Sequence, residues 1–456
     1  MAGGIGFRTA ALPEPLHLEM VAATVPEHDV RILDMRLDDS LDTVLREFGP
    51  EMVAVTALTP EVYAARNILR QVKSFSSEIF TVVGGHHATL LPQDFFVPQV
   101  DAVAIGDAES MFRDLVQAVA DRRGLDAVSD VVWRDRDGGF VRNPRSEARV
   151  DLGHLPLPRR DLTEDYRGEY FFLFDKPDTS VATSRGCPFR CKFCSVHEFH
   201  RGAVNQMPPG RVLVELATIQ TEHITFVDDN FLVNCKRENA IADLIRSEGI
   251  HRRYSMECRT DSIVRHPELI EKWVDVGLYA VLLGLEGGSD KMLHNVNKSC
   301  SIDTNNEAIR ILQDHGVIIW GAFLVDPDWT EDDFKRLGDY VREKKITHTQ
   351  FTVLTPLPGT ELYRQRRDEL LTSDYSCFDT LHAVLPTRLP RETFYRHFAG
   401  LYRQYDIEPY IDLVRAGKMT VEDCKRGKRM LDAMADWTRY IEKDPILGHR
   451  ESTLCL

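Results

Sequence analysis

The sequence predicts an α/β protein with three parts: a parallel sheet, a partial (β/α)6 barrel and a helical C-terminal region. Short apolar runs alternate with amphipathic helical stretches over the first part of the chain, and a second series with longer spacing begins near Val181. Short strands joined by helices are typical of parallel sheets covered on both faces. Beyond about Pro390 the chain is charge-rich with a helical pattern.

Composition limits the class of protein. The net charge of −15 over 456 residues repels phosphate backbones, so nucleic acid is not an expected partner. The sequence has no apolar run of 18 residues and no basic start followed by an apolar stretch, so we expect neither a transmembrane segment nor a secretory signal, and a cytoplasmic setting. The nine cysteines are scattered except for one tight group, which favours thiol or metal chemistry over disulfides.

The first part, residues 1–124, is predicted to form a Rossmann-like parallel sheet. We expect its helices at 16–25, 41–48, 61–73 and 112–119 and its strands at 30–34, 52–56, 80–85 and 100–106. The loops after these strands carry small or apolar residues, namely Thr56, Leu58, Gly84, Gly85 and Gly106. Because open α/β sheets bind ligands at the carboxyl ends of their strands, these loops are a candidate ligand crevice. The simpler interpretation of any single glycine is a tight turn after a strand.

Residues 125–175 differ in character and are predicted to be a linker that contains a hairpin. Asp137–Gly139 forms the expected turn between Val131–Trp133 and Phe140–Val141, and a proline-rich stretch follows at 155–158. Residues 176–390 are assigned to the barrel, with strands expected at 181–184, 223–227, 254–258, 280–285, 318–325 and 347–354. Barrel chemistry is expected at the carboxyl ends of these strands, and residues 391–456 form the helical C-terminal region.

Three cysteines follow the first barrel strand with the spacing C-x3-C-x2-C: Cys187, Cys191 and Cys194. Thiolates favour soft metals, namely zinc, copper(I) or an iron–sulfur cluster. A structural zinc site needs a fourth protein ligand, which His197 or His200 would supply. A four-iron cluster on three cysteines leaves one iron open to a small molecule. The spacing at the mouth of a barrel favours the cluster.

This motif, with Phe193 just before the last cysteine, resembles the radical S-adenosylmethionine (SAM) enzymes. The resemblance implies that Cys187, Cys191 and Cys194 hold a [4Fe-4S] cluster and that SAM chelates the open iron. One electron then cleaves SAM to a 5′-deoxyadenosyl radical, which the protein must shield and aim. A reductant such as flavodoxin or ferredoxin is an implied partner.

Later strand ends supply candidate contacts for SAM. Asp228 ends the second strand, where this family places a motif for the SAM amino group, although the glycine-glycine-glutamate form is absent. Glu257, Arg259 and Glu286 stand at positions that resemble ribose and carboxylate contacts, and Phe193 lies within the cysteine motif. A surface ion pair or a strand-end cap is an equally weighted interpretation of each charged residue.

The first part is similar to the cobalamin-binding domains of some radical SAM enzymes. Thr56 and Leu58 match the family's Ser-x-Leu loop, Gly84 and Gly85 match its glycine pair, and Gly106 lies in the next strand-end loop. No Asp-x-His-x-x-Gly motif occurs near the N-terminus, so no histidine ligand for cobalt is evident. The chain opens at Gly3–Phe7 where the family has a preceding strand, which leaves a shortened domain or an upstream start as alternatives.

Five stretches make the chain look like hopanoid C-3 methylases, at 4–16, 82–92, 160–163, 354–360 and 385–390. The resemblance implies a cobalamin-dependent C-methyltransferase acting on an sp3 carbon of a hopanoid-like lipid or a natural product, peripheral at the membrane if the substrate is a lipid. The segments 171–174 and 320–323 are candidate linings for an apolar cavity, with core packing the simpler interpretation.

Three alternatives stay open at this point. The scaffold also resembles the anaerobic magnesium-protoporphyrin ester cyclases, which implies cyclisation or hydroxylation without methyl transfer. A rearranging enzyme with a vestigial cobalamin domain is the second alternative. The third is a zinc-stapled binding module with Cys187, Cys191, Cys194 and His197 as ligands.

Overall fold

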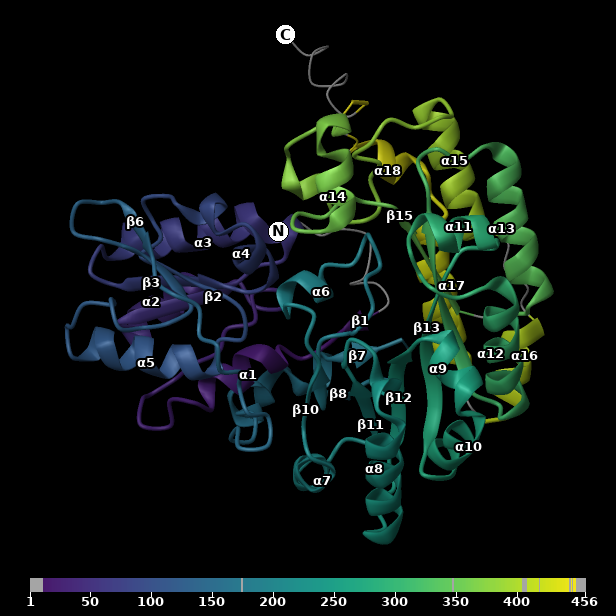
Figure 1. Ribbon diagram of the computed structural model, residues 1–456, viewed down its shortest axis with the longest axis horizontal. Helices are drawn as coiled ribbons and strands as arrows, with labels where there is room; N and C mark the ends of the chain where they lie inside the picture. The colour runs from purple at the N-terminus through teal and green to yellow at the C-terminus, as the bar shows by residue number, and fades with distance from the viewer. Residues whose placement is uncertain are drawn as a thin grey trace.

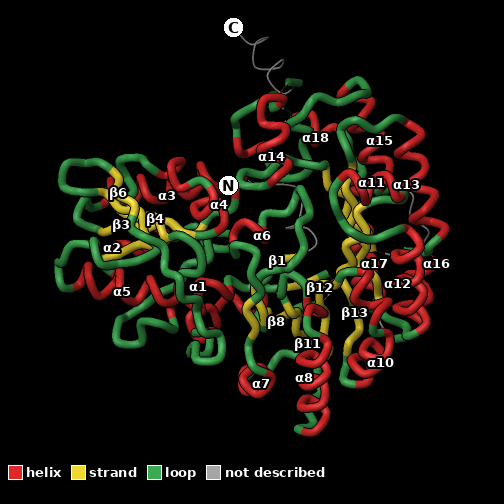
Figure 2. The backbone as a smooth tube through the Cα atoms, viewed as in Figure 1, coloured by secondary structure: helices red, strands yellow, loops and turns green. Residues whose placement is uncertain are grey.

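The computed structural model describes residues 11–173, 175–346, 348–403, 408–417, 419–442, 444 and 446–447. Two sheet-based units lie side by side, the N-terminal one purple to blue and the barrel teal to green (Figure 1). The tube view separates their strands into two yellow groups (Figure 2). This arrangement confirms the predicted α/β class and the order of its parts.

The N-terminal sheet has five strands in the order β2-β3-β4-β5-β6. Their bounds are β2 Met52–Thr56, β3 Phe80–Gly84, β4 Ala102–Ala104, β5 Val131–Arg134 and β6 Phe140–Arg142. The first three are parallel, whereas β5 pairs with both β4 and β6 in antiparallel fashion. The sheet therefore places the carboxyl ends of β2, β3 and β4 at one edge.

Two expectations for this unit are wrong. The hairpin assigned to a linker at 125–175 extends the first sheet instead, because pairing with β4 buries Val131 and Val132 completely. The run 30–34 forms no strand, since no neighbouring strand offers it hydrogen bonds among the described residues. An apolar run needs a partner strand as well as a β-compatible composition.

Helices cover both faces of the N-terminal sheet. Their bounds are α1 Leu16–Ala22, α2 Leu41–Phe48, α3 Val62–Phe75, α4 His86–Leu90 and α5 Glu109–Ala120. Leu69 of α3 and Ala88 of α4 pack in one apolar cluster, and Leu115 of α5 packs in another. The two clusters share no residue because alternate side chains of each strand point to opposite faces.

The second sheet has six parallel strands in the order β15-β14-β13-β12-β11-β8. The bounds are β8 Asp178–Val181, β11 His223–Phe226, β12 Arg253–Cys258, β13 Leu278–Glu286, β14 Ile318–Val325 and β15 His348–Val353. The edge strands β8 and β15 do not pair, so the barrel is open on one side. The first barrel strand ends at Val181 rather than at 184, and Thr347, expected to begin the last strand, lies outside the described residues.

The barrel's outer helices include α7 Pro209–Leu216, α8 Cys235–Ser247, α9 Thr260–Arg265, α10 Pro267–Asp275, α11 Asp290–Asn295, α12 Ile302–Asp314, α13 Glu331–Glu343 and α14 Glu361–Arg366. The C-terminal helices α15 Arg391–Leu401, α16 Glu408–Arg415, α17 Val421–Met434 and α18 Thr438–Glu442 follow. Phe398 and Tyr440 belong to the apolar core of the barrel, so this region packs against it. No helix in the described part of the chain is long and apolar enough to cross a membrane.

A short strand pair packs against the inner side of the barrel sheet. β1 Ala11–Leu12 pairs with β7 Phe171–Phe172, and the Phe172 ring lies 5.1 Å from that of Trp320 on β14. Trp320 is only 2% exposed, so these segments form core rather than an open cavity lining. Phe174 and the stretch 3–7 lie outside the described residues.

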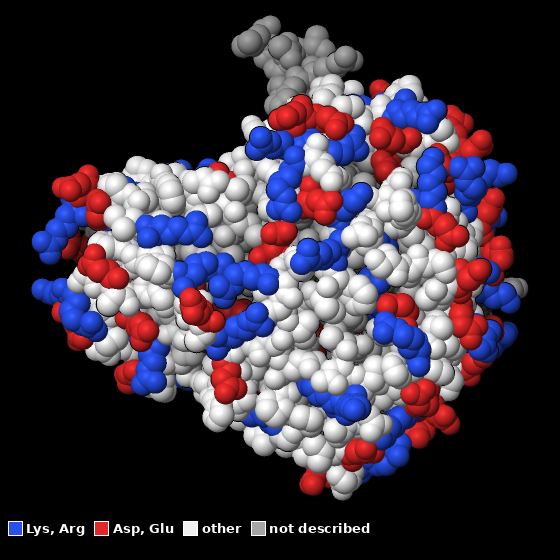
Figure 3. All heavy atoms as spheres, in the orientation of Figure 1, with Lys and Arg blue, Asp and Glu red and all other residues white. Residues whose placement is uncertain are grey.

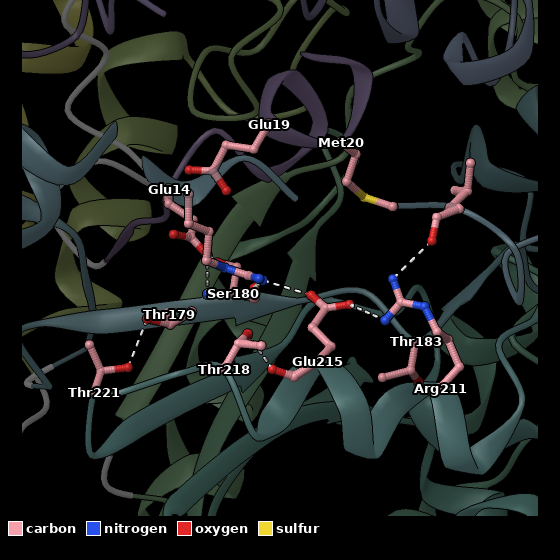
Figure 4. Close-up of polar contacts among 12 residues, drawn as sticks. Glu14, Glu19, Met20, Thr179, Ser180, Thr183, Arg211, Glu215, Thr218 and Thr221 are labelled. Carbon is pink, nitrogen blue, oxygen red and sulfur yellow. Dashed lines mark hydrogen bonds and ion pairs between the residues drawn. The ribbon is translucent and has the colours of Figure 1, made fainter. Parts of the chain in front are cut away.

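A buried ionic network ties the start of the chain to the barrel (Figure 4). Arg160 contacts Glu14 at 3.2 Å and Glu215 of α7 at 2.7 Å, and Glu14 also accepts a hydrogen bond from the Ser180 amide at 2.9 Å. Burial, with the neighbouring Glu14, raises the pKa of Glu19 on α1 to about 7. The network therefore joins α1, β8 and α7 through charges that are hidden from water.

Candidate functional site

The loop that carries the three cysteines is fixed by the carboxyl end of β11. Asp228 accepts hydrogen bonds from the amide and hydroxyl of Thr183, both at 2.5 Å, and from the Ser184 hydroxyl at 2.8 Å. The side chain is buried, and burial raises its pKa. Asp228, expected at the SAM amino group, thus has the geometry of a strand-end cap that positions the cysteine loop.

Further contacts hold the rest of this loop. Asp229 accepts a hydrogen bond from the Gly186 amide at 2.7 Å, and Arg237 donates to the Thr183 carbonyl at 2.8 Å. The Lys192 amide donates to Val296 after α11 at 3.0 Å. The backbone on either side of the cysteines is therefore preorganised for a ligand.

The three thiols lie in an environment that suits ligation of iron. Cys187, Cys191 and Cys194 are free and half-buried. Burial raises the pKa of Cys194 to about 12, and Cys191, Asp229 and Cys187 add to this effect. Arg259 places Nη1 3.9 Å from the sulfur of Cys191, so a metal-bound thiolate there would face a cation. These donors fit a thiolate-bound iron–sulfur cluster.

The zinc-stapled module lacks geometric support. In the part of the chain that the structure describes, which includes all four proposed ligands, no group of three or more His, Cys, Asp or Glu side chains is placed to hold a single metal ion. A multinuclear cluster contacts each thiolate through a different iron, so its ligands need not converge on one point.

A buried ion pair stands at the end of β13. Glu286 contacts Lys298 at 2.5 Å, and both side chains are about one-tenth exposed or less. Glu286 has a left-handed backbone with φ of 59°, beside a register shift between Gly284 and Glu286. Such strain persists only where surrounding contacts enforce it and is concentrated at functional sites. Burial opposes the charge of Lys298, but Glu286 and Cys191 together raise its pKa.

The remaining SAM candidates lie around this pair. Arg259 donates to the Lys298 carbonyl at 2.6 Å and stacks 3.6 Å above the Phe189 ring. Glu257 retains accessible surface within the barrel, and desolvation raises its pKa to about 7, with Asp229 and Glu286 adding to the shift and Lys298 opposing it. Phe193 packs on an apolar cluster with Met292 and Leu324. The structure thus places Arg259 beside Cys191 and joins Arg259 and Glu286 through Lys298.

The carboxyl edge of the N-terminal sheet is built from small residues. Gly85 has φ of 94°, and a Cβ there would lie 2.4 Å from the hydroxyl of Thr56. Gly84 would place its Cβ 3.4 Å from that of Ala104 on β4, and Leu58 is 55% exposed. This edge offers open backbone and an apolar side chain, which fit a large flat ligand such as a corrin.

Gly106 belongs to the same edge. Its amide donates to Thr89 at 2.8 Å, and Arg145 lies where a Cβ would be, at 2.4 Å. A pocket beside it is lined by residues of both units, including Asp107, Arg185, Phe199 and His200. All five cobalamin candidates, Thr56, Leu58, Gly84, Gly85 and Gly106, lie in the loops at the ends of β2, β3 and β4.

Comparison with known proteins agrees with this arrangement. Residues 181–341 match the radical SAM superfamily, and residues 5–116 match the B12 binding domain. A hopanoid C-3 methylase of Methylococcus capsulatus is 33% identical over 84% of this chain and 74% of its own. An anaerobic magnesium-protoporphyrin IX monomethyl ester cyclase of Rubrivivax gelatinosus is 25% identical over 83% of this chain and 70% of its own.

Among solved structures, the fold is similar to the methyltransferase TsrM from Kitasatospora setae with cobalamin and a [4Fe-4S] cluster bound. The TM-score is 0.70 at 15% identity, over 94% of this chain and 97% of that one. Fold and site together define an iron–sulfur enzyme with a corrin-binding unit. The chain belongs to the cobalamin-dependent radical SAM methylase family, whose cofactors are a [4Fe-4S] cluster, SAM and cobalamin.

Several residues of this site were not predicted from the sequence, among them Asp229, Lys298, His86 and Arg185. Asp229 and His86 directly follow Asp228 and Gly85, and Arg185 lies two residues before Cys187, so these three carried a signal. Lys298 carried none, because it pairs with Glu286 only after a helix turns the chain back.

Proposed function

We propose that this protein is a C-methyltransferase that methylates an sp3 carbon of a lipid or natural-product substrate at the junction of its two units. One observation carries the proposal: His86, the first residue of α4 after β3, lies 2.6 Å from Ser195, directly after Cys194. The loops expected to hold the corrin and the loop expected to hold the cluster are therefore in contact. Methyl transfer to a substrate radical requires this proximity.

The residues have distinct parts in this proposal. Cys187, Cys191 and Cys194 would hold the cluster, and the strand-end loops of the first sheet would hold cobalamin. When bound, these groups supply the electron that cleaves SAM and the methyl group that is transferred. Arg259 and Lys298 place positive charge beside Cys191, while Glu257 and Glu286 offer acceptors to the amino or hydroxyl groups of SAM. Asp228, Asp229 and Arg237 hold the cysteine loop in place, which keeps its cysteines at fixed positions relative to these charged side chains.

An exposed apolar side chain at the carboxyl edge of the barrel sheet supports an apolar substrate. Val227, directly after β11, is 44% exposed, whereas Leu282 of β13 is half-buried and packs on the cluster of Phe172 and Trp320. The relative that is a hopanoid C-3 methylase supports a hopanoid-like lipid as the first substrate to try. A large apolar body would gain roughly 25 cal/mol for each Å² of apolar surface it buries there.

The test uses anaerobically purified full-length protein with SAM, a low-potential reductant of the flavodoxin or ferredoxin class, and lipid or natural-product extracts. We expect iron, acid-labile sulfide and corrin in the protein, and mass spectrometry should show a product heavier by one methylene group. S-adenosylhomocysteine and 5′-deoxyadenosine should form together. A product without the added carbon would contradict methyl transfer and favour the cyclase or hydroxylase alternative.

A further inference from the structure

Three side chains of the N-terminal unit, His86, Asp107 and Glu109, hold the cysteine loop at its two ends. His86 contacts the hydroxyl of Ser195, next to Cys194, and its ring stacks on Phe199 at 4.7 Å with an interplanar angle of 8°. Burial lowers the pKa of His86 to about 4, so the imidazole is neutral and acts as a hydrogen-bonding group. This contact joins α4 to the start of the short helix α6 Val196–Phe199.

The other end of the loop is held by charge. Arg185, two residues before Cys187, contacts Asp107 at 3.0 Å and forms a bidentate pair with Glu109. The Arg185 and Glu109 side chains are 14% and 4% exposed. Although burial opposes ionisation, Arg185 holds the pKa of Glu109 below its usual value. The pair is therefore ionised and hidden from solvent.

The positions of these residues in the sequence are informative. His86 directly follows Gly85, and Asp107 directly follows Gly106, the two positive-φ glycines of the candidate corrin loops. A ligand that presses on the backbone of Gly85 or Gly106 must also shift the next residue. Each contact then leads within one or two residues to a cluster cysteine. The carboxyl edge of the N-terminal sheet and the cysteine loop are thus linked by two short paths.

We propose that His86 and Asp107 are positioning residues that couple occupancy of the corrin site to the cluster loop, so that bound cobalamin strengthens the binding of SAM. The inference rests on the proposed function for the identity of the two sites. Cobalamin would fix both ends of the loop, and SAM would then bind a loop that has already lost its freedom. By linkage, SAM would strengthen cobalamin binding by the same factor.

The test measures the dissociation constant of SAM on the cluster-loaded full chain, with and without hydroxocobalamin. Without reductant no turnover occurs, so the measurement reports binding alone. We expect cobalamin to tighten SAM binding about fivefold, at the lower end of typical couplings. In His86→Phe, which keeps the ring stack but loses the hydrogen bond, the ratio should fall, because only the path through Asp107 and Arg185 remains. His86→Gln retains a donor at the position of Nε2 and should restore part of it.

Two further variants make the result specific. Ser195→Ala removes the same hydrogen bond from the other side and should lower the ratio to the same extent, which covers the case that His86→Phe folds poorly. Tyr63→Phe is the matched control, because Tyr63 joins the two units through Ser373 at 3.4 Å without touching the cysteine loop. Its ratio should stay at the wild-type value. The electron paramagnetic resonance signal of the reduced cluster should shift on cobalamin addition in wild type and Tyr63→Phe alone.

A wild-type ratio of one, or a wild-type ratio retained in both His86→Phe and Ser195→Ala, would overturn the coupling. Protein that binds cluster, SAM and corrin but shows no coupling leaves the proposed function intact. Protein that binds no cluster or no corrin contradicts the proposed function and the coupling with it.

Discussion

The carboxyl edges of the two sheets face the same junction, but they carry different kinds of residue. The barrel edge is dense with buried charge, as in Asp228, Arg259 and the pair Glu286–Lys298. The N-terminal edge has small residues and bare backbone, as at Gly84 and Gly85. On the viewed surface, by contrast, acidic and basic side chains are interspersed (Figure 3).

This difference reflects what each edge has to hold. A metal cluster with a charged cosubstrate needs fixed counter-charges, which act most strongly where water is excluded. A large neutral macrocycle needs room and close approach to backbone, which side chains would prevent. Changes of charge should therefore damage the barrel edge, and changes of volume should damage the N-terminal edge.

The largest effect is expected at Cys191. Replacing Cys191 by alanine removes one of three cluster ligands, so SAM cleavage should be abolished in anaerobic assays of 5′-deoxyadenosine. Cys424→Ala is the matched control, because Cys424 lies on α17 of the C-terminal region and should leave iron content and cleavage unchanged. Normal deoxyadenosine formation by Cys191→Ala would refute the cluster assignment.

A charge change at Lys298 is next in size. Lys298→Met leaves Glu286 buried without its cation, and removal of one partner from a buried pair typically costs about 3–5 kcal/mol. Thermal unfolding of the cluster-loaded chain should show this loss. The double variant with Glu286→Gln should recover most of it, because no unpaired charge remains. Equal loss in the single and double variants would show that packing, rather than charge, dominates here.

A volume change at Gly85 tests the N-terminal edge in the way that a charge change at Lys298 tests the barrel edge. Gly85→Ala places a methyl group 2.4 Å from the Thr56 hydroxyl and 3.0 Å from the Ala57 amide, so hydroxocobalamin binding should weaken by about tenfold or more while cluster content stays normal. Gly138→Ala is the matched control: its φ is 83°, yet nothing lies within 4 Å of its Cβ. Unchanged corrin affinity in Gly85→Ala would remove this loop from the binding site.

The smallest effect concerns Glu19, at the junction of the two units. Its pKa rises from the ordinary 4.5 to about 7 on folding, so the folded state binds the proton more tightly and stability falls as pH rises between these values. Glu19→Gln lacks this fall and should gain on the order of 1 kcal/mol over wild type above pH 7. Denaturant unfolding at pH 5 and pH 8 measures the difference, which should vanish at pH 5 or below.

Local patterns predicted most of the regular elements. The strand at Met52–Thr56 and the helix at Leu41–Phe48 have the expected bounds, because composition and periodicity agree there. The role of Val131–Arg134 was not predictable, since only tertiary pairing decides whether a hairpin stands alone or joins a sheet. The prediction of a strand at 30–34 was wrong for the same reason.

The candidate site was predictable only where its residues lie close together in the sequence. Three cysteines within eight residues stand out in the sequence, whereas His86 and Ser195 are separated by 109 positions. Asp228 and Asp229 are adjacent and both hold the cysteine loop, but Asp228 binds Thr183 and Ser184, whereas Asp229 binds the Gly186 amide and faces His200 at 3.6 Å. Sequence alone does not choose between such neighbours.

The strand pair β1–β7 also bears on how the chain is made. Ala11 packs in one cluster with Trp320, which is synthesised about 300 residues later. At about 5–20 residues per second, that interval is roughly 15–60 seconds. The N-terminal unit can begin to fold during this time, but β1 cannot yet pack against Trp320 of the barrel. The earliest segment of the described chain is thus among the last to reach its native position.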